Sequence, residues 1–438
     1  MPDCRILGGL VIDPAGGVHA ARDVVVRSGR IAAVTEPQGV PPGPDDVDAS
    51  GCWVVPGLID MHVHLREPGY EYKETVETGT RAAVAGGFTA VACMANTNPV
   101  NDNAAVTALI RDRARRAGLA RVYPIGALSK GLQGVALAEI GEMHEAGIVA
   151  VSDDGRPIVS GGLMRRALEY TSMFGIPVIV HEQDEEIAAD GVMHDGAVAA
   201  RLGLRGIPAA AEESMIARDI ALLERTGGRL HIAHLSTAGA VALVRAAKAR
   251  GLPVTAEVTP HHFTLTDQAV AGYDTDAKMN PPLRSARDVE AVRQGLADGT
   301  IDVIATDHAP HHADEKNVEF DAAANGIVGL ETALPLALEM AREAGLSADV
   351  LIAALSTNPA RVLRVTGGTL GVGAVADVTV LDPQRTWVVQ PERMRSKSRN
   401  TPFAGRTMTG QAVVTMVGGH VVWRAATGSV TPRPLEDA

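Results

Sequence analysis

The stretch Gly57–Glu74, GLIDMHVHLREPGYEYKE, divides the chain into two styles of sequence. Before it, short apolar runs are separated by glycine and proline, which is typical of β-strands joined by turns. After it, short β-rich runs alternate with longer segments of helical period. The stretch itself begins as an apolar run and ends in His62 and His64, with Arg66 close behind. It therefore predicts the first strand of a new domain, with polar side chains at its end.

The β-rich and helical segments after residue 56 alternate in a regular order. Eight β-rich runs are separated by helical segments, and two further helices follow the last run. Eight such units over roughly 250 residues predict a (β/α)8 TIM barrel, an α/β fold, which we place at 56–360. The expected strands are 58–64, 89–94, 121–127, 148–152, 177–181, 230–235, 253–258 and 301–306. The expected helices are 74–85, 103–117, 137–146, 162–174, 212–225, 238–249, 286–297, 329–344 and 348–355.

A β pattern returns after residue 360, where VTVLDP and VVWR alternate between apolar and polar positions. Such alternation is typical of strands with one buried face. These runs are similar in style to those before residue 56. We therefore expect 1–55 and 361–438 to form together one small β-sandwich domain beside the barrel.

Charge and composition exclude several classes of protein. The formal net charge is −12 with no basic stripe, which argues against nucleic-acid binding. No run approaches the roughly 18 apolar residues of a membrane helix, and charges interrupt the first apolar run, unlike in a signal peptide. Cys4, Cys52 and Cys93 show no C-x-x-C spacing, which fits a reducing compartment. We expect a cytoplasmic enzyme with a small-molecule substrate.

Histidine and aspartate residues gather at the ends of the expected strands, where catalytic residues of such barrels lie. A single histidine at a strand end is more often a polar cap, but four together favour a metal site. Imidazole and carboxylate suit zinc, and the set exceeds the four ligands of one tetrahedral ion, so we expect two metals. The candidates are His62, His64, Asp153 or Asp154, His181, His234 and Asp307.

The loops after these strands hold residues that suit an anionic substrate. The rigid fork of Arg66 can bind a carboxylate through two hydrogen bonds. Asn96 and His311 can contact the same group, and Asn280 lies in the long segment after the seventh strand. Each has an ordinary alternative, since Arg66 can be a surface residue and both asparagines are common in turns. Asp60 lies deeper in the first strand, where we favour a supporting hydrogen bond over ligation.

Two segments match a known pair of signatures. DMHVHLREP at 60–68 resembles the D-x-H-x-H-x-R-x-P signature of dihydroorotases, and ATDHAPHHADEK at 305–316 resembles their second signature. The segments MANTNP, SDDG, HLST, TPHHFTLTD, KMNPPLR and NGIVGLET follow in the family's order. The chain thus resembles the long bacterial dihydroorotases of the amidohydrolase superfamily. The resemblance implies the reversible interconversion of N-carbamoyl-L-aspartate and (S)-dihydroorotate, the third step of de novo pyrimidine (UMP) biosynthesis.

The resemblance also implies a role for each candidate. Many relatives bridge their metals with a carboxylated lysine, but the long bacterial type has an aspartate there, for which Asp153 aligns best and Asp154 is the alternative. Ala95 replaces the proline that usually precedes Asn96 in the family. The implied zinc ligands are His62, His64 and Asp307 for one ion and His181 and His234 for the other, with Asp307 also the catalytic base and acid. The implied substrate contacts are Arg66, Asn96 and His311 for the carboxylate and Asn280 and Gly326 around the ring.

Two other interpretations remain at this point. Another cyclic amidase, a hydantoinase or an allantoinase, shares the barrel but uses the lysine of the fourth strand. An inactive dihydroorotase-like partner of aspartate transcarbamoylase has lost metal ligands that are all present here. An active enzyme can also form a complex with aspartate transcarbamoylase, or a homo-oligomer, and the sequence identifies no contact surface for either.

Overall fold

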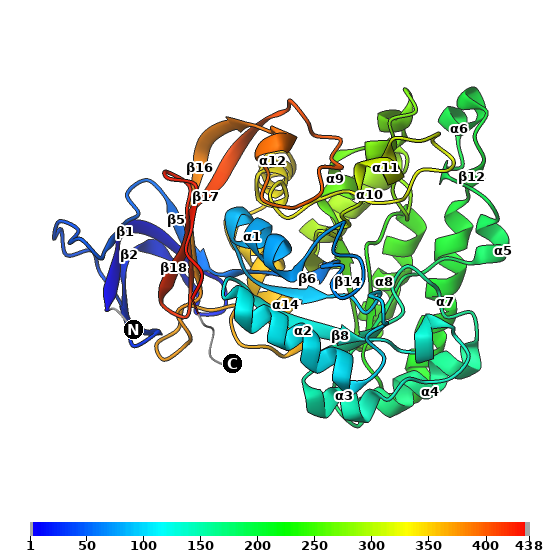
Figure 1. Cartoon of the computed structure of the whole chain (residues 1–438), viewed down its shortest axis with the longest axis horizontal. Coiled ribbons are helices and arrows are strands. Elements are labelled where there is room, and N and C mark those ends of the chain that lie inside the picture. The colour runs from blue at the N-terminus through cyan, green and yellow to red at the C-terminus, as the bar shows by residue number, and fades with distance from the viewer. Residues whose placement is uncertain (1–2, 434–438) are drawn as a thin grey trace.

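The computed structural model describes residues 3–433, and its centre is a barrel of parallel strands (Figure 1). Each strand pairs with the next in chain order, and a bridge between Val63 and His308 joins the last strand to the first. The predicted eight-stranded barrel is therefore confirmed. Its strands are β6 Leu58–Val63, β7 Phe88–Cys93, β8 Arg121–Gly126, β9 Ala150–Ser152, β10 Val178–Val180, β13 Leu230–Ile232, β14 Val254–Val258 and β15 Val303–Ile304.

Helices follow the strands and cover the outside of the barrel. Many begin at a side chain that accepts a hydrogen bond from a backbone N–H of the first turn, as Thr75, Asn103 and Ser285 do. These caps end the loops before α1, α2 and α10 at a defined residue. The surrounding helices are α1 Val76–Gly86, α2 Ala104–Ala117, α3 Ile140–Ala146, α4 Gly161–Ser172, α7 Ala209–Thr226, α8 Ala238–Ala249, α10 Ala286–Ala297, α12 Ala333–Ala344, α13 Ala348–Ile352 and α14 Asn358–Leu363.

Several loops at the mouth carry short elements of their own that the sequence pattern did not predict. The connection after β10 contains a pair of short parallel strands, β11 and β12. A π-helical turn at Ala353–Thr357 joins α13 to α14. The short elements of the loops are α5 Glu185–Ala188, β11 Met193–His194, α6 Ala197–Leu202, β12 Gly206–Ile207, α9 Pro260–Thr264 and α11 Ala313–Lys316, with 3-10 turns at Lys130–Leu132, Asp267–Val270 and Thr275–Ala277.

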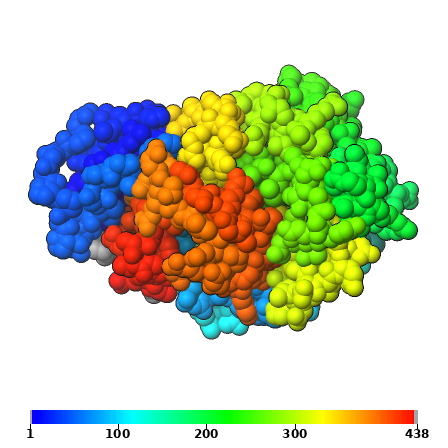
Figure 2. All heavy atoms as spheres, turned by 90° about the horizontal axis from the view of Figure 1, so that it is seen from above, coloured from blue at the N-terminus to red at the C-terminus, as the bar shows by residue number. Residues whose placement is uncertain are grey.

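Both ends of the chain form a second unit, as predicted, and Figure 2 shows their blue and red atoms side by side at one end of the molecule. Its strands run in the order β19-β18-β17-β16-β5-β1-β2-β3, with β4 paired to β1. Hydrogen bonds thus join all nine described strands in one sheet, rather than the two separate sheets of the expected sandwich. The strands are β1 Cys4–Asp13, β2 Val18–Arg27, β3 Arg30–Thr35, β4 Val47–Asp48, β5 Trp53–Pro56, β16 Val378–Val388, β17 Thr407–Val417, β18 His420–Arg424 and β19 Ser429–Val430.

The two units meet where the chain passes from one sheet to the other. Strand β5 ends at Pro56 and β6 begins at Leu58, while α14 ends at Leu363 and β16 begins at Val378. Within residues 3–433, no helix is long and apolar enough to cross a membrane.

A buried ion pair also connects the units. Arg121 at the start of β8 donates from Nε to Asp377 Oδ2 at 2.8 Å, and Asp377 Oδ1 accepts from the Gly418 N–H at 2.7 Å. The two charged side chains are only 10% and 4% exposed. Burial lowers the pKa of Arg121, but the charge of Asp377 and its hydrogen bond outweigh this and raise it overall.

We expect Asp377→Ala to lower the free energy of unfolding by about 3–5 kcal/mol, because it leaves the buried Arg121 charge unpaired. Urea unfolding followed by circular dichroism measures the change. Glu77→Ala is the control, since the Arg81–Glu77 pair is 42% and 58% exposed and should contribute at most about 1 kcal/mol. Equal shifts for the two variants would show that the Asp377 contact does not join the units.

Candidate active site

Polar side chains from five strands meet at the mouth of the barrel, where the strands end. His62 lies on β6 with His64 just after it, and further ligand candidates follow β9, β10, β13 and β15. All are buried although they carry polar atoms: His62, His64, Asp154, His181, His234 and Asp307. Asp60 Oδ1 accepts hydrogen bonds from the His62 N–H and the Thr306 N–H at 3.1 Å each, so Asp60 supports β6 as expected.

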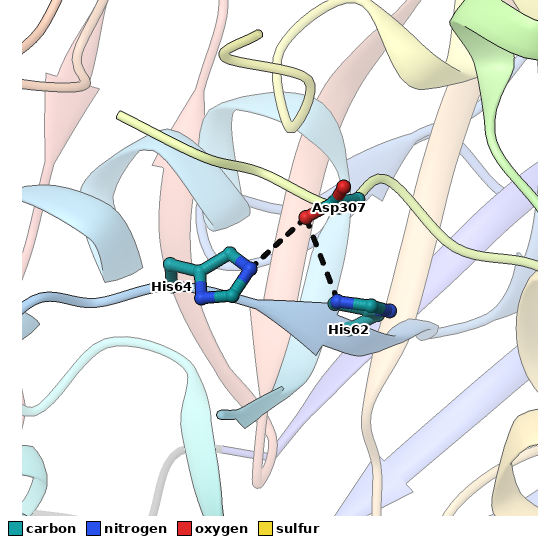
Figure 3. Close-up of side chains that lie close together, drawn as sticks. All are labelled: His62, His64 and Asp307. Carbon is teal, nitrogen blue, oxygen red and sulfur yellow. Dashed lines mark hydrogen bonds and ion pairs between the residues drawn. The ribbon is translucent and has the colours of Figure 1, made fainter. Parts of the chain in front are cut away.

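The first ligand group consists of His62, His64 and Asp307 (Figure 3). Asp307 Oδ1 lies 3.0 Å from His64 Nε2 and 3.5 Å from His62 Nε2. The three ligand atoms lie within 4.8 Å of one another, although β6 and Asp307 are separated by most of the barrel sequence. One imidazole pair and one carboxylate thus converge on a common point.

The second group is arranged around Asp154, which follows β9. Its Oδ1 lies 3.4 Å from His62 Nε2, 3.5 Å from His234 Nε2 and 3.7 Å from His181 Nδ1. Its Oδ2 lies 3.4 Å from His64 Nε2. The Asp154 carboxylate therefore lies between the two histidine pairs, which is the geometry that a bridging ligand requires.

The prediction that Asp153 faces the histidines is wrong. Its Oδ1 instead accepts from the backbone N–H groups of Leu128 and Ser129 at 2.8 and 2.9 Å, and its Oδ2 accepts from the Ser129 hydroxyl. Successive side chains of an extended strand point to opposite faces, so only one of the two aspartates can face the barrel interior. Ala150 packs with interior residues of other strands and Val151 with the outer core, which places Asp154 inside.

Glu257 on β14 is a supporting residue that sequence reasoning missed. Its Oε1 lies 2.6 Å from His62 Nδ1, so the imidazole N–H donates to it and leaves Nε2 to face Asp154 and Asp307. Burial opposes ionisation, but the charge of His62 and hydrogen bonds from His231 and His62 lower the pKa of Glu257 to about 2. A glutamate inside the apolar strand VTAEV was the available signal.

The buried atoms of this cluster fit divalent cations. His62 Nε2 and Asp154 Oδ1 are buried without a hydrogen-bond partner, and they face each other across 3.4 Å. Burial raises the pKa of Asp154, but the charge of His62 and the neighbouring His181 and His234 rings hold it well below the usual range. An ionised carboxylate surrounded by imidazole nitrogens is a donor set suited to zinc and similar metals.

The predicted substrate contacts lie beside this cluster. Arg66 Nη2 is 3.3 Å from His311 Nε2, and Arg66 Nε donates to the Pro310 carbonyl at 3.2 Å. Burial and the charges of Arg66 and Lys73 lower the pKa of His311 to about 3, so its ring is neutral. Asn96 Oδ1 lies 2.9 Å from His64 Nδ1 and accepts a hydrogen bond from its N–H, which leaves the amide N–H groups of Asn96 for a ligand.

Asn280 and Gly326 complete the set. Asn280 Nδ2 lies 3.4 Å from His181 Nε2, which places this residue against the second histidine pair. Gly326 has φ 158°, and a Cβ there would lie 2.5 Å from the Ala309 carbonyl oxygen and 2.7 Å from His311 Cδ2. Only glycine fits at this close approach. All the predicted site residues except Asp153 therefore lie at the mouth.

Comparison with known proteins identifies the family. A family model described as "Dihydro-orotase-like" matches residues 51–240. The dihydroorotase of Anaeromyxobacter dehalogenans (strain 2CP-C) is 62% identical over 419 residues, which cover 95% of this chain and 97% of that protein. The chain belongs to the dihydroorotase family. The dihydroorotase of Syntrophotalea carbinolica is also 58% identical over 96% of this chain and 98% of its own length.

Solved structures show how the dihydroorotase fold relates to other cyclic amidases. The L-hydantoinase (dihydropyrimidinase) from Arthrobacter aurescens superposes with a TM-score of 0.88 at 27% identity, covering 98% of each chain. The two share the barrel with an additional β domain, which confirms the predicted fold class. This hydantoinase is 27% identical to the chain, whereas the two dihydroorotases are 58% and 62% identical. The sequence comparison therefore favours a dihydroorotase over a hydantoinase.

We expect Asp154→Asn to lower metal affinity by about tenfold or more, because it removes a charged ligand atom from between the histidine pairs. Metal content per chain, measured by mass spectrometry after dialysis against limiting zinc, should fall by at least one ion relative to wild type.

Asp153→Asn is the matched comparison. It should keep the wild-type metal content and lose about 1–3 kcal/mol of stability, because its contacts to Leu128 and Ser129 are structural. Loss of metal from Asp153→Asn with retention in Asp154→Asn would reverse the assignment.

Proposed function

We propose that the cluster at the barrel mouth is the catalytic centre of a dihydroorotase. There the ring amide of (S)-dihydroorotate is hydrolysed and, in the biosynthetic direction, N-carbamoyl-L-aspartate is cyclised. The observation that supports this most is the Asp154 carboxylate, whose Oδ1 lies within 3.7 Å of His62, His181 and His234 while its Oδ2 faces His64. Such a shared carboxylate is typical of two-metal hydrolytic sites.

We further propose two zinc ions per chain. His62, His64 and Asp307 would hold one ion, His181 and His234 the other, and Asp154 would contact both. Bound there, the metals would lower the pKa of a water molecule and polarise the amide carbonyl of the substrate. The alternation of imidazole and carboxylate donors supports zinc over magnesium or calcium, which prefer sites made of oxygen ligands.

Asp307 is the proton carrier in this proposal. Burial raises its pKa, but the charge of His62 and the hydrogen bond from His64 outweigh this and keep it a carboxylate. During hydrolysis it accepts a proton from the attacking water and then donates it to the ring nitrogen as the C–N bond breaks. In the reverse direction it takes the proton from the carbamoyl nitrogen, and the ring closes with loss of water.

Arg66, His311 and Asn96 orient the substrate in this proposal. Arg66 offers a planar pair of donors to the carboxylate outside the ring, and the Asn96 amide adds another. Arg66 is buried, which lowers its pKa but leaves it charged. Lys73 Nζ, 3.4 Å from His311 Nδ1, is a second cation nearby, paired with Glu315 at 2.7 Å. These local charges attract an anionic substrate to a protein whose net charge is −12.

We expect Asp307→Asn to reduce kcat by about 10²–10⁴-fold, because the proton between water and ring nitrogen loses its carrier. Dihydroorotate ring opening is measured together with metal content and circular dichroism, so that loss of fold or metal is seen separately.

Asp314→Asn is the control for the loss of a carboxylate near this loop, since Asp314 is 90% exposed. Wild-type kcat in metal-loaded Asp307→Asn would contradict the assignment of Asp307 as base and acid.

We expect Arg66→Ala to raise KM for N-carbamoyl-L-aspartate by about 10- to 100-fold, the effect of losing charged hydrogen bonds of about 1.5–3 kcal/mol. Metal content should stay unchanged, because Arg66 contacts no proposed ligand atom. Arg66→Lys, which keeps the charge but not the fork, should lie between the two. Steady-state kinetics in the cyclisation direction provides the measurement, and unchanged KM and kcat would rule out the carboxylate contact.

We also propose that the chain acts in the cytoplasm and assembles with aspartate transcarbamoylase, which catalyses the preceding step of the pathway. The three cysteines are all unbridged, in keeping with a reducing compartment. Size-exclusion chromatography of the two purified enzymes tests the assembly, and separate elution at micromolar concentrations would argue against it.

A further inference from the structure

The residues between β16 and β17 leave the β sheet and return to the barrel. We call residues 395–403, RSKSRNTPF, the strap. In Figure 1 this region is the orange-red connection that runs from β16 and β17 toward the barrel near α11, and Figure 2 shows the orange atoms of the region against green barrel atoms. The strap belongs to the β domain by sequence but contacts the loops that form the mouth.

Asn400 is the central residue of the strap and is 4% exposed. Its Nδ2 donates to the carbonyl oxygens of Ala309 and Gly326 at 3.0 and 2.9 Å. Its Oδ1 accepts from the His311 N–H at 3.1 Å, and its own carbonyl oxygen accepts from the Val328 N–H at 2.9 Å. Two donors and an acceptor of one amide thus join the loop after β15 to the loop that contains Gly326.

The backbone partners fix the orientation of the amide. A carbonyl oxygen only accepts and a backbone N–H only donates, so Nδ2 must face Ala309 and Gly326 and Oδ1 must face His311. Aspartate in this position cannot donate to either carbonyl. Alanine leaves the Ala309 carbonyl and the His311 N–H without the Asn400 partner, and the Gly326 carbonyl keeps only Lys316 Nζ at 3.2 Å. The site is therefore specific for an asparagine.

The other end of the strap is bound to Glu74, the last residue of the stretch that opens the barrel. Glu74 is fully buried and accepts from the Ser396 hydroxyl and, at 3.1 Å, from the Lys397 N–H. Its Oε2 also lies 3.2 Å from His308 Nε2. The His308 carbonyl in turn accepts from the His64 N–H at 2.9 Å. The strap therefore contacts Glu74, just before α1, and is linked through Glu74 and His308 to the segment that carries His64.

The loops held by Asn400 carry two of the proposed substrate contacts. His311 lies 3.3 Å from Arg66, and Gly326 allows the close approach of its chain to the His311 ring. A carboxylate clamp works only when its groups are held to within about 0.5 Å of the productive geometry. Within the β15 loop, Glu315 Oε2 lies 3.2 Å from Nδ1 of the His311 side chain, and the Ala309 N–H donates to the Ile327 carbonyl. Asn400 adds a hydrogen bond to the backbone of His311 itself.

We propose that Asn400 is a positioning residue for substrate binding, which acts by fixing His311 and Gly326 relative to Arg66. The inference rests on the proposed role of Arg66 and His311 at the substrate carboxylate. It makes the strap, and through it the β domain, a component of the active site. A displacement of the clamp by about 1 Å is enough to lower kcat/KM by on the order of 100-fold.

The test uses the full chain loaded with metal. Asn400→Ala should raise KM for N-carbamoyl-L-aspartate by about 10- to 100-fold while metal content stays at the wild-type value. Asn400→Asp, made in parallel, keeps the acceptor for the His311 N–H and loses both donors, so it should show an effect of the same direction. A folded, metal-loaded variant of either kind with wild-type KM and kcat would overturn the proposal.

A double-mutant cycle separates positioning from a merely structural role. In the Arg66→Ala background, Asn400→Ala should have little further effect on KM, because the clamp it positions is already absent. Fully additive effects would show that Asn400 acts elsewhere and would overturn the proposal.

Asn358→Ala is the control for loss of a partly buried asparagine, since its Nδ2 donates to the Asp302 carbonyl at 2.8 Å, before β15 and away from the mouth. It should lower the urea midpoint without changing KM. Wild-type turnover of dihydroorotate is measured first, because its absence would refute the proposed function itself, which is a different outcome from unchanged kinetics in the Asn400 variants.

Discussion

The mouth of the barrel depends on one buried charge, the carboxylate of Asp154. It lies among four imidazoles, and its Oδ1, like His62 Nε2 opposite, has no hydrogen-bond partner. Leaving such groups unpaired in a buried place costs on the order of 1–3 kcal/mol each, and more for a charge. Apolar packing cannot offset this locally. Cations bound between the ligand groups, as proposed above, would offset this cost, which would link metal binding to the stability of the mouth.

The orientation of the imidazole rings is set by hydrogen-bond acceptors that are not themselves ligand candidates. Glu257 and Asn96 accept from Nδ1 of His62 and His64, so the Nε2 atoms of both rings face inward. Backbone strain contributes too, since His234 and Asp307 have φ angles of 32° and 46° where their strands end. Such conformations cost about 1–3 kcal/mol each and occur at sites where the surrounding structure enforces them. The rigid barrel supplies that enforcement.

The sequence predicted the barrel and most of the site because both follow from local pattern. Each strand has a short apolar run, and each ligand candidate lies near the end of such a run or just beyond it. Asp153 and Asp154 could not be separated this way, because both satisfy the pattern and one step of register decides which faces inward. The alternation of Ala150 and Val151 between inner and outer cores resolves it, but only once the packing is seen. The only sequence signal of Glu257 is a charged residue inside the apolar strand VTAEV, which does not identify the histidine it contacts.

The contacts of the strap could not be predicted from local sequence pattern, for a different reason. Its contacts join Asn400 to Gly326, 74 positions away, and Ser396 to Glu74, 322 positions away, so neither end predicts the other. Contacts of this kind arise because the β sheet is built from both chain termini: β5 pairs with β16, which brings the C-terminal half back to the start of the barrel. Val378, the first residue of β16, pairs with Pro56, which directly precedes the first barrel strand. A barrel ending at Leu363 would keep all six ligand candidates and lose every contact of the strap, so the ligands and the geometry of the substrate clamp depend on different parts of the chain.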